Sequence, residues 1–113
     1  MRLTIVGSGD AFGSGGRFNT CFWVETSKAT LMLDCGASSP VALKRCGLEF
    51  GRIDAVLLSH LHGDHFGGLG FLLLDEQLLQ KRTRPLLIAG PPTTSSSAVN
   101  SRPMAGGTPR TWK

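Results

Sequence analysis

The sequence predicts an α/β protein in which helices pack on a mixed β-sheet. Short apolar runs with β-branched residues, several of them closed by glycine, are typical of strands. Two of these runs are separated by the dipeptide "SK", a connection short enough for a hairpin. In the second half of the chain, strand and helix patterns alternate, which implies helices lying on a sheet. With 113 residues, of which 41% are hydrophobic and 18% charged, the chain has the size and composition of one globular domain.

Three strands are expected in the first part of the chain. The patterns that predict them are "RLTIVG" (2–7), "TCFWVET" (20–26) and "ATLMLDCG" (29–36).

A glycine-rich loop, "GSGDAFGSGG" (7–16), follows the first strand. Glycines after a strand also occur in dinucleotide-binding turns, but such a turn needs a helix that begins inside the glycine run. Here the run leads into a segment with strand composition. We therefore expect a flexible turn between two strands, which could also line a site.

Helices and strands should alternate from residue 39 onward. In "SPVALKRCGLEFG" (39–51), Ser39 as a cap and Pro40 at the first helical position predict a short helix from about Pro40 to Cys46. A buried strand, "IDAVLLSH" (53–60), one or two helical stretches within 64–82, and a last strand, "PLLIAG" (85–90), should follow.

The composition changes at Pro91. Residues 91–113 contain four of the six prolines, three basic residues and no acidic one. Residues 1–90 carry nine basic and eight acidic residues, so the net charge of +4 is weak evidence for a nucleic-acid surface. The interpretation is a partial domain over 1–92 and a disordered or aberrant tail over 93–113, either a natural extension or a truncated or frameshifted end.

The expected location is the cytoplasm. The apolar runs are too short for a signal peptide or a membrane span. The cysteines are three in number and lack the C-x-x-C spacing, which favours reduced thiols.

All three histidines of the chain lie in one stretch, "LLSHLHGDHFGGLG" (57–70). In H-x-H, the two imidazoles of an extended segment project to the same side, so that His60 and His62 can grip one metal ion. Asp64 and His65 follow where the chain should turn into a helix, and they can face a second ion beside the first. Such binuclear centres clamp the attacking and leaving oxygens in phosphoester hydrolysis. Nitrogen and carboxylate ligands suit zinc best, with manganese or iron as alternatives. Gly63 would allow the tight path between the ligands, and Gly67, Gly68 and Gly70 would permit close backbone approach.

The segment "SHLHGDH" resembles the H-x-H-x-D-H signature of the metallo-β-lactamase superfamily. The segments "LTIVGSGDAFGSGGRFNTCFWVE", "LMLDCG" and "IDAVLLSHLHGDHFGGL" are similar to successive amino-terminal segments of the branch that contains ribonuclease Z and related phosphodiesterases. The resemblance covers residues 1 to about 92. It implies the amino-terminal half of an αβ/βα sandwich, a mixed sheet with helices on one face.

The resemblance also implies roles for individual residues. His60 and His62 would bind the first metal, and Asp64 and His65 the second. Asp64 would in addition act as the general base that accepts a hydrogen bond from the attacking water. Asp34 would orient a histidine through its other ring nitrogen. Asp54 would have a similar orienting role. An ordinary structural role is an equal alternative for Asp54 and a less favoured alternative for Asp34.

The function implied is a metal-dependent hydrolase that acts on a phosphodiester, RNA or a small nucleotide-like substrate, through a hydroxide activated by two metal ions. The family's later segments supply further ligands, whereas this chain has no histidine after His65 and no acidic residue after Glu76. The chain is therefore expected to be truncated and inactive alone. The alternatives are a non-catalytic metal-binding module and a regulatory half-domain. Without its second half, the sheet would expose an apolar face including some of Val6, Phe22, Val24, Leu31, Leu33, Val56 and Leu58, to be covered by self-association or by a homologous partner.

Overall fold

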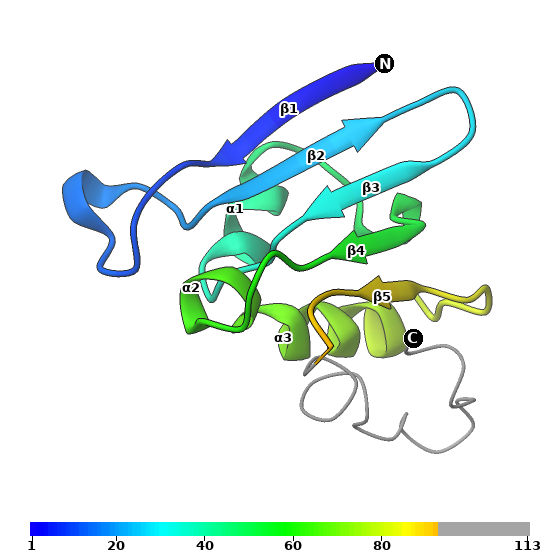
Figure 1. Cartoon of the computed structure of the whole chain (residues 1–113). Helices are drawn as coiled ribbons and strands as arrows, with labels where there is room; N and C mark the ends of the chain where they lie inside the picture. The colour runs from blue at the N-terminus through cyan, green and yellow to red at the C-terminus, as the bar shows by residue number, and fades with distance from the viewer. Residues whose placement is uncertain (93–113) are drawn as a thin grey trace.

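A computed structural model describes residues 1–92 and shows a five-stranded sheet with helices on one face (Figure 1). The predictions for residues 93–113 lie outside this described part. The strands follow the order β1-β2-β3-β4-β5, so each strand pairs with its neighbours in sequence. The first two pairings are antiparallel and the last two are parallel, which makes the sheet mixed as predicted.

The strands are short and lie inside the segments that predicted them. Their bounds are β1 (Arg2–Gly7), β2 (Cys21–Glu25), β3 (Thr30–Leu33), β4 (Ala55–Leu57) and β5 (Leu87–Ala89). The hairpin between β2 and β3 begins with the pair Glu25 and Thr30, and the Thr26 side chain accepts a hydrogen bond from the backbone N–H of Ala29. The glycine loop joins the antiparallel pair β1 and β2 through a short 3₁₀ turn, η1 (Ser14–Gly16). The glycine loop is thus a turn between strands, as expected. The first α-helix after β1 is α1, which begins well beyond the glycine run.

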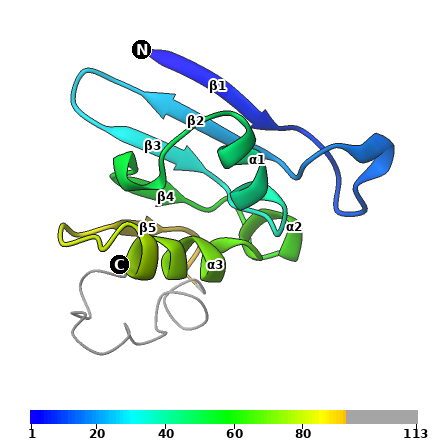
Figure 2. The ribbon, with the colours of Figure 1, turned by 180° about the vertical axis from the view of Figure 1, so that it is seen from behind.

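The helical elements cover one face of the sheet, which is seen from the helix side in Figure 2. They are α1 (Ser39–Arg45), the 3₁₀ turn η2 (Phe50–Arg52), α2 (Gly63–Phe66), α3 (Leu69–Leu74) and the π-helical turn η3 (Asp75–Leu79). Parallel pairing of β3 with β4 and of β4 with β5 requires crossover connections, and α1 and α3 provide them. No helix in the described residues is long and apolar enough to cross a membrane.

The core lies between the sheet and these helices. Alternate strand residues point to opposite faces, and the helix-facing set includes the fully buried side chains of Trp23, Met32, Val56 and Ile88. Leu43 from α1 and Leu72 from α3 pack into the same cluster.

The opposite face of the sheet, referred to below as the bare sheet face, is apolar, and no helix of residues 1–92 covers it (Figure 1). Cross-strand pairing produces two rows that contain no polar side chain: Leu3–Val24–Leu31–Ala55–Leu87 and Ile5–Phe22–Leu33–Leu57–Ala89. Leu3 and Ile5 are more than half exposed, although both are large and apolar. Of the residues expected on such a face, Phe22, Val24, Leu31 and Leu33 belong to these rows. Val6, Val56 and Leu58 do not, because they lie in the buried core on the helix side.

The start of α1 differs from the prediction by one residue. The N-cap is Ser38, Ser39 is the first helical residue, and Pro40 follows it. The Ser39 hydroxyl is buried and has no hydrogen-bond partner, so it does not cap the helix. Ser38 instead accepts a hydrogen bond from the backbone N–H of Asn19, which ties α1 to the end of the glycine loop.

Candidate metal-binding site

The three histidines lie at the carboxyl ends of the adjacent parallel strands β3 and β4. His60 and His62 belong to the short connection between β4 and α2, and His62 is the N-cap of α2. Asp64 and His65 are in the single turn of α2. Asp34 follows the last residue of β3 and has a φ of 62°, a left-handed conformation that aspartate tolerates better than most residues.

Asp34 is the centre of the hydrogen-bond network under the histidines. It is only 6% exposed. Its Oδ1 accepts a hydrogen bond from the backbone N–H of Ser59 at 2.7 Å, and its Oδ2 accepts one from the Ser59 hydroxyl at 2.7 Å. The same Oδ2 lies 2.7 Å from Nδ1 of His65. One carboxylate therefore links β3, the residue before His60, and α2.

This network selects one tautomer for two of the rings. Because a carboxylate accepts hydrogen bonds, Nδ1 of His65 carries the proton and its Nε2 is left with a lone pair. The Ser59 hydroxyl donates to Asp34, so at the 2.9 Å contact between Ser59 Oγ and His60 the ring Nδ1 donates. His60 is thereby also left with a free lone pair on Nε2.

The rings and the second carboxylate gather on the same side of the loop. The centroid of the His60 ring lies 4.7 Å from that of His62 and 3.9 Å from that of His65. Nε2 of His65 lies 3.2 Å from Oδ2 of Asp64. Two ligand atoms of one tetrahedral zinc, each about 2.1 Å from the ion, lie roughly 3.4 Å from one another. The separation of the Asp64 and His65 donors is therefore compatible with a shared ion, and also with a direct ion pair in which Nε2 of His65 carries a second proton.

The imidazole and carboxylate donors of this loop suit a metal ion, but they come together only in pairs. Within residues 1–92, no group of three or more histidine, cysteine, aspartate or glutamate side chains is arranged so that it could hold an ion. The described residues thus offer two donors from His60 and His62, two more from Asp64 and His65, and an oriented imidazole, without a closed coordination sphere.

Three residues to which no role was assigned from the sequence support this loop. Ser59 connects Asp34 to His60, and only its position before the first histidine could have drawn attention to it. Asn19 bonds the backbone of Asp10 and of Ser38. A Cβ on Gly36 would overlap the Asp64 carbonyl oxygen and the Asn19 side chain, so the close approach at this point requires glycine.

Two of the four glycines in the motif make the close approach expected of them, and the other two do not. A Cβ on Gly67 or Gly68 would meet backbone oxygens, which agrees with the expected close approach. Around Gly63 and Gly70 there is open space, and neither has a positive φ. The tight path was assigned to Gly63, whereas the close packing against the metal loop is made by Gly36.

Asp54 lies at the other end of β4 from the histidines, and its contacts are structural. Its Oδ2 accepts a hydrogen bond from the backbone N–H of Thr30 at 2.7 Å, and its Oδ1 pairs with Arg84. The hydrogen bond from Thr30 lowers the pKa of the Asp54 carboxyl. Asp54 therefore joins β3 to β4 and the segment before β5, and it is not placed to orient a histidine.

The sheet, the helices on one of its faces and the histidine loop at the strand ends define the amino-terminal part of a metallo-β-lactamase fold of the ribonuclease Z-like type, a fold of hydrolases. The model of the family described as "Anti-Pycsar protein Apyc1" matches residues 1–98, and the chain belongs to this family.

Proteins with related sequences carry two different names. The chain is 39% identical over 89 residues to the Anti-Pycsar protein Apyc1 of a Paenibacillus species, a match that covers 79% of this chain and 36% of the relative. It is 36% identical over 103 residues to the ribonuclease Z of Treponema denticola, with 90% of this chain and 33% of the relative covered. The chain thus spans about a third of the length of the curated relatives it matches.

Solved structures support the same fold. The short form of human tRNase Z superimposes with a TM-score of 0.74 at 32% identity, covering 85% of this chain and 36% of that one. The metallo-β-lactamase fold protein YhfI of Bacillus subtilis gives a TM-score of 0.67 at 27% identity, covering 78% and 35%.

Proposed function

We propose that this chain supplies half of a binuclear metal site that hydrolyses phosphodiesters. In this proposal His60 and His62 hold one ion, and Asp64 and His65 hold the other. The observation that carries it is the chain of contacts from Asp34 through His65 to Asp64, which fixes one imidazole with its free nitrogen 3.2 Å from a carboxylate oxygen. Buried carboxylates that orient a metal-binding imidazole through its other nitrogen are common in metalloenzymes.

Two divalent ions at such a site stabilise the attacking and leaving oxygens of an in-line displacement at phosphorus. The residues of this chain have separate tasks around that reaction. Asp34 holds the ring of His65 and, through Ser59, the ring of His60. The Asp64 carboxylate accepts a hydrogen bond from the attacking water and takes its proton.

The proposed substrate is a phosphodiester in RNA or in a small nucleotide-like molecule. Relatives named ribonuclease Z support the RNA alternative, and the family description adds a second biological setting without naming a substrate. Zinc is the proposed metal because imidazole and carboxylate donors suit it, with manganese or iron as alternatives. The cytoplasm is the proposed location, given the odd number of widely spaced cysteines.

Calorimetric zinc titration tests the assignment of the two pairs. All variants carry Cys46→Ser, because the thiol of Cys46 is exposed and could compete for zinc. We expect two weak zinc sites in the protein that carries Cys46→Ser alone. The double variant His60→Ala, His62→Ala should keep one site, and the double variant Asp64→Ala, His65→Ala should keep the other. Glu49→Ala, which removes an exposed carboxylate away from the loop, should leave both sites unchanged. Zinc binding should weaken as the pH is lowered, because protons compete with the metal for the imidazole donors. Equal zinc binding by all four proteins would refute the assignment.

Hydrolysis of bis-p-nitrophenyl phosphate tests the activity. With two protein donors for each ion, the 113-residue chain should be no faster than buffer with the same zinc concentration. A longer protein that contains this segment together with further ligands should turn the substrate over and lose that activity on Asp64→Ala. Robust turnover by the 113-residue chain that Asp64→Ala abolishes would mean that a second subunit completes the site.

A second candidate is a non-catalytic half-domain whose bare sheet face binds a homologous partner or another copy of itself. The two apolar rows across all five strands favour it, because exposed apolar patches of this extent are rare on monomers. Amide exchange with and without a full-length homologue distinguishes the two roles. A partner that covers this face should protect the amides of the three inner strands, β2, β3 and β4, whereas a well-protected monomer at tens of micromolar would argue against any need for a partner.

A further inference from the structure

The glycine loop after β1 carries an aromatic side chain that the core does not use. Phe12 is 91% exposed, which makes it the most exposed large apolar side chain of residues 1–92 after the amino-terminal Met1. Phe18, near the end of the same loop, is instead packed against the core and lies under the guanidinium of Arg45. Single exposed apolar side chains are common on protein surfaces, but Phe12 is distinguished by its location and by the way its backbone is held.

The glycine loop lies at the same edge of the sheet as the histidines. Because β1 and β3 both run antiparallel to β2, and β4 is parallel to β3, the strands β1, β3 and β4 end at one edge. Figure 1 shows the loop after β1 and α2 at this end of the sheet. The side chain of Asn19 joins the two. It donates a hydrogen bond to the Asp10 carbonyl at 2.9 Å and packs against Gly36, whose backbone approaches that of Asp64. A phosphodiester at the histidine loop therefore has the glycine loop as a neighbour.

The backbone of the loop is fixed where Phe12 projects from it. Oδ1 of Asp10 accepts hydrogen bonds from the backbone N–H groups of Phe12 and Ser14, each at 3.0 Å. The neighbours of Phe12 in sequence are Ala11 and Gly13, so no bulky side chain adjoins the ring on either side. A flat group can thus reach the face of a ring whose position is set in advance.

The charges of the loop suit an anionic ligand that carries a base. Residues 7–18 contain one acidic residue, Asp10, and one basic residue, Arg17. The Asp10 carboxylate is turned to the N–H groups of its own loop, whereas Arg17 is exposed and its Nε lies close to Gly15. A guanidinium donates well to phosphate oxygens, and nucleobases of any sequence stack on aromatic rings.

We propose that Phe12 stacks on a base of the substrate, beside the phosphodiester that is hydrolysed. This inference rests on the proposed function, because it takes the histidine loop as the place of the phosphodiester. It deepens that function by restricting the substrate to phosphodiesters that carry a nucleobase, in RNA or in a small nucleotide. In this role Phe12 holds the substrate in position, and Asp10 holds Phe12.

Nucleotide binding in the absence of zinc tests this contact separately from the metal site. The probes are the dinucleotide adenylyl-adenosine, the RNA oligonucleotide hexa-adenylate, and dimethyl phosphate, which is a phosphodiester without a base. Ligand-observed NMR gives their dissociation constants for the 113-residue chain and for the variants Phe12→Ala, Phe12→Tyr and Phe71→Ala.

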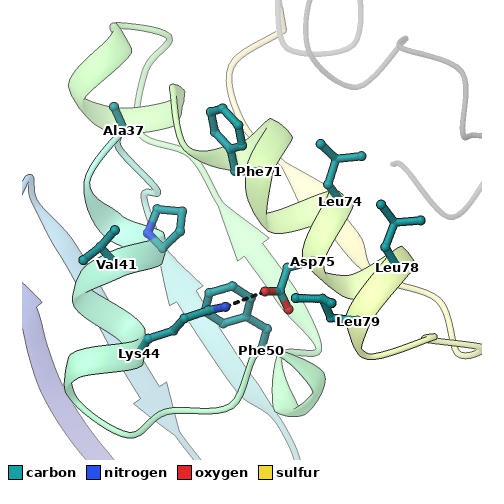
Figure 3. Close-up of a pocket in the computed structure, with 10 residues that line it drawn as sticks. Ala37, Val41, Lys44, Phe50, Phe71, Leu74, Asp75, Leu78 and Leu79 are labelled. Carbon is teal, nitrogen blue, oxygen red and sulfur yellow. Dashed lines mark hydrogen bonds and ion pairs between the residues drawn. The ribbon is translucent and has the colours of Figure 1, made fainter.

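Phe71 is the matched control because it is another exposed phenylalanine. It is 69% exposed on α3, where it lines an apolar groove of about 630 Å³ between α1 and the helix formed by α3 and η3. Figure 3 shows the side chain of Val41 on α1 across this groove from those of Phe71 and Leu74. A base that stacks on any exposed ring would lose affinity in Phe71→Ala as well. Thermal unfolding should show unchanged stability for all variants, because both positions are exposed.

We expect Phe12→Ala to weaken the binding of adenylyl-adenosine at least about fivefold, which is the smallest loss typical of one stacked base. Phe12→Tyr, which keeps a ring, and Phe71→Ala should both bind the dinucleotide like the parent. Dimethyl phosphate should not distinguish the four proteins. Phe12→Ala should also weaken the binding of hexa-adenylate. Tighter binding of hexa-adenylate than of the dinucleotide supports an RNA substrate, and equal binding supports a small nucleotide.

Equal affinities of the parent and Phe12→Ala for adenylyl-adenosine would overturn the inference, and so would an absence of binding to the parent at millimolar concentrations. Neither result bears on the metal ligands, which the zinc titration tests by itself. If the zinc titration failed while Phe12→Ala still weakened nucleotide binding, the metal-dependent function would be wrong and the base contact at the glycine loop would stand.

Discussion

Replacing Asp34 by asparagine should weaken zinc binding much more than a comparable change at another buried aspartate. Asparagine has the same shape and also tolerates the left-handed conformation, so the φ of 62° is retained. What changes is the hydrogen bonding. Asp34 accepts hydrogen bonds from the Ser59 backbone, from the Ser59 hydroxyl and from His65. An amide has one acceptor oxygen, and its nitrogen must face at least one of these donors.

The size of the effect follows from the number of bonds that are lost. Each hydrogen bond to a charged acceptor contributes about 1.5–3 kcal/mol, so Asp34→Asn should reduce the free energy of unfolding by about 2–4 kcal/mol. Asp34→Ala should reduce it further, because all three bonds are lost and alanine in the left-handed region costs roughly 1–2 kcal/mol. Loss of the partner that orients a metal ligand typically lowers metal affinity by about 10–100-fold. We therefore expect a zinc affinity reduced within that range for Asp34→Asn.

Asp75→Asn provides the matched control. Asp75 is also buried and bonded to two side chains, Lys44 and Gln80, but it belongs to η3 and not to the histidine loop. Urea unfolding should show that both variants are destabilised, whereas zinc titration should show a loss of affinity for Asp34→Asn only. Nitrogen-15 NMR of the His65 ring should show the Nδ1-protonated tautomer in the parent and a mixture in Asp34→Asn. Equal zinc affinities for the two variants would refute the orienting role of Asp34.

Three further results are expected. Gly36→Ala should lower zinc affinity, because the new Cβ would overlap the Asp64 carbonyl oxygen, whereas the new Cβ of Gly63→Ala would meet open space and should have no effect. Zinc titration of both variants checks this, and equal effects on affinity would contradict it. Burial raises the pKa of the Cys21 thiol to about 12 and also raises that of Cys35, so a thiol reagent should label only Cys46 in the folded protein and all three cysteines in urea; rapid labelling of three thiols without urea would count against the buried core. The hydrogen bond from Thr30 lowers the pKa of the Asp54 carboxyl below its ordinary 3.8. The stabilising contribution of Asp54 is therefore present above that pH and is lost as the pH falls through the lowered pKa. Below about pH 4, the free energy of unfolding measured in urea should decline less steeply for Asp54→Asn than for the parent, and identical profiles for the two proteins would contradict this.

The strands and the mixed topology could be predicted because their signals are local. β-branched runs, a short hairpin connection and a strand-helix alternation each act over a few residues, and the sheet follows from them. Which of the two alternating sets on each strand faces the helices could not be predicted in this way. The runs are apolar at nearly every position, so period-two alternation is absent. Val6, Val56 and Leu58 were therefore among the candidates for the bare sheet face, although they lie in the core.

The candidate site was predictable to the extent that its groups lie within one segment. His60, His62, Asp64 and His65 span six positions, and a turn brings them together whatever the rest of the fold does. Asp34 was found only through the resemblance to a known family, since it comes from another strand. Asn19 and Gly36 act through packing between the glycine loop, the end of β3 and α2, and no local signal identifies such contacts. Asp54 was expected to act like Asp34, with an ordinary structural role as an equal alternative, and it lies at the opposite end of β4 from the histidines.

The two apolar surfaces of this molecule have different origins. The bare sheet face follows from the composition of the strands. Strands that are apolar at every position suit a sheet that is covered on both faces, so one apolar set of side chains stays exposed unless a second layer covers it. Relatives about three times as long have chain available for such a layer. The apolar groove between α1 and the helix formed by α3 and η3 cannot be explained in the same way. A surface helix needs only one apolar stripe, yet Asp75 and Glu76 are turned into the protein there and find Lys44 and Arg82 as partners, while leucines stay outside. Burying two acids costs free energy even when they are paired. These pairs also join separate elements, because Lys44 belongs to α1 and Arg82 donates hydrogen bonds to the carbonyls of Ile53 and Pro85. The acids of η3 are therefore turned inward to connect the helix with α1 and with the segments on either side of β4, and the leucines of the same turn are left on its outer side.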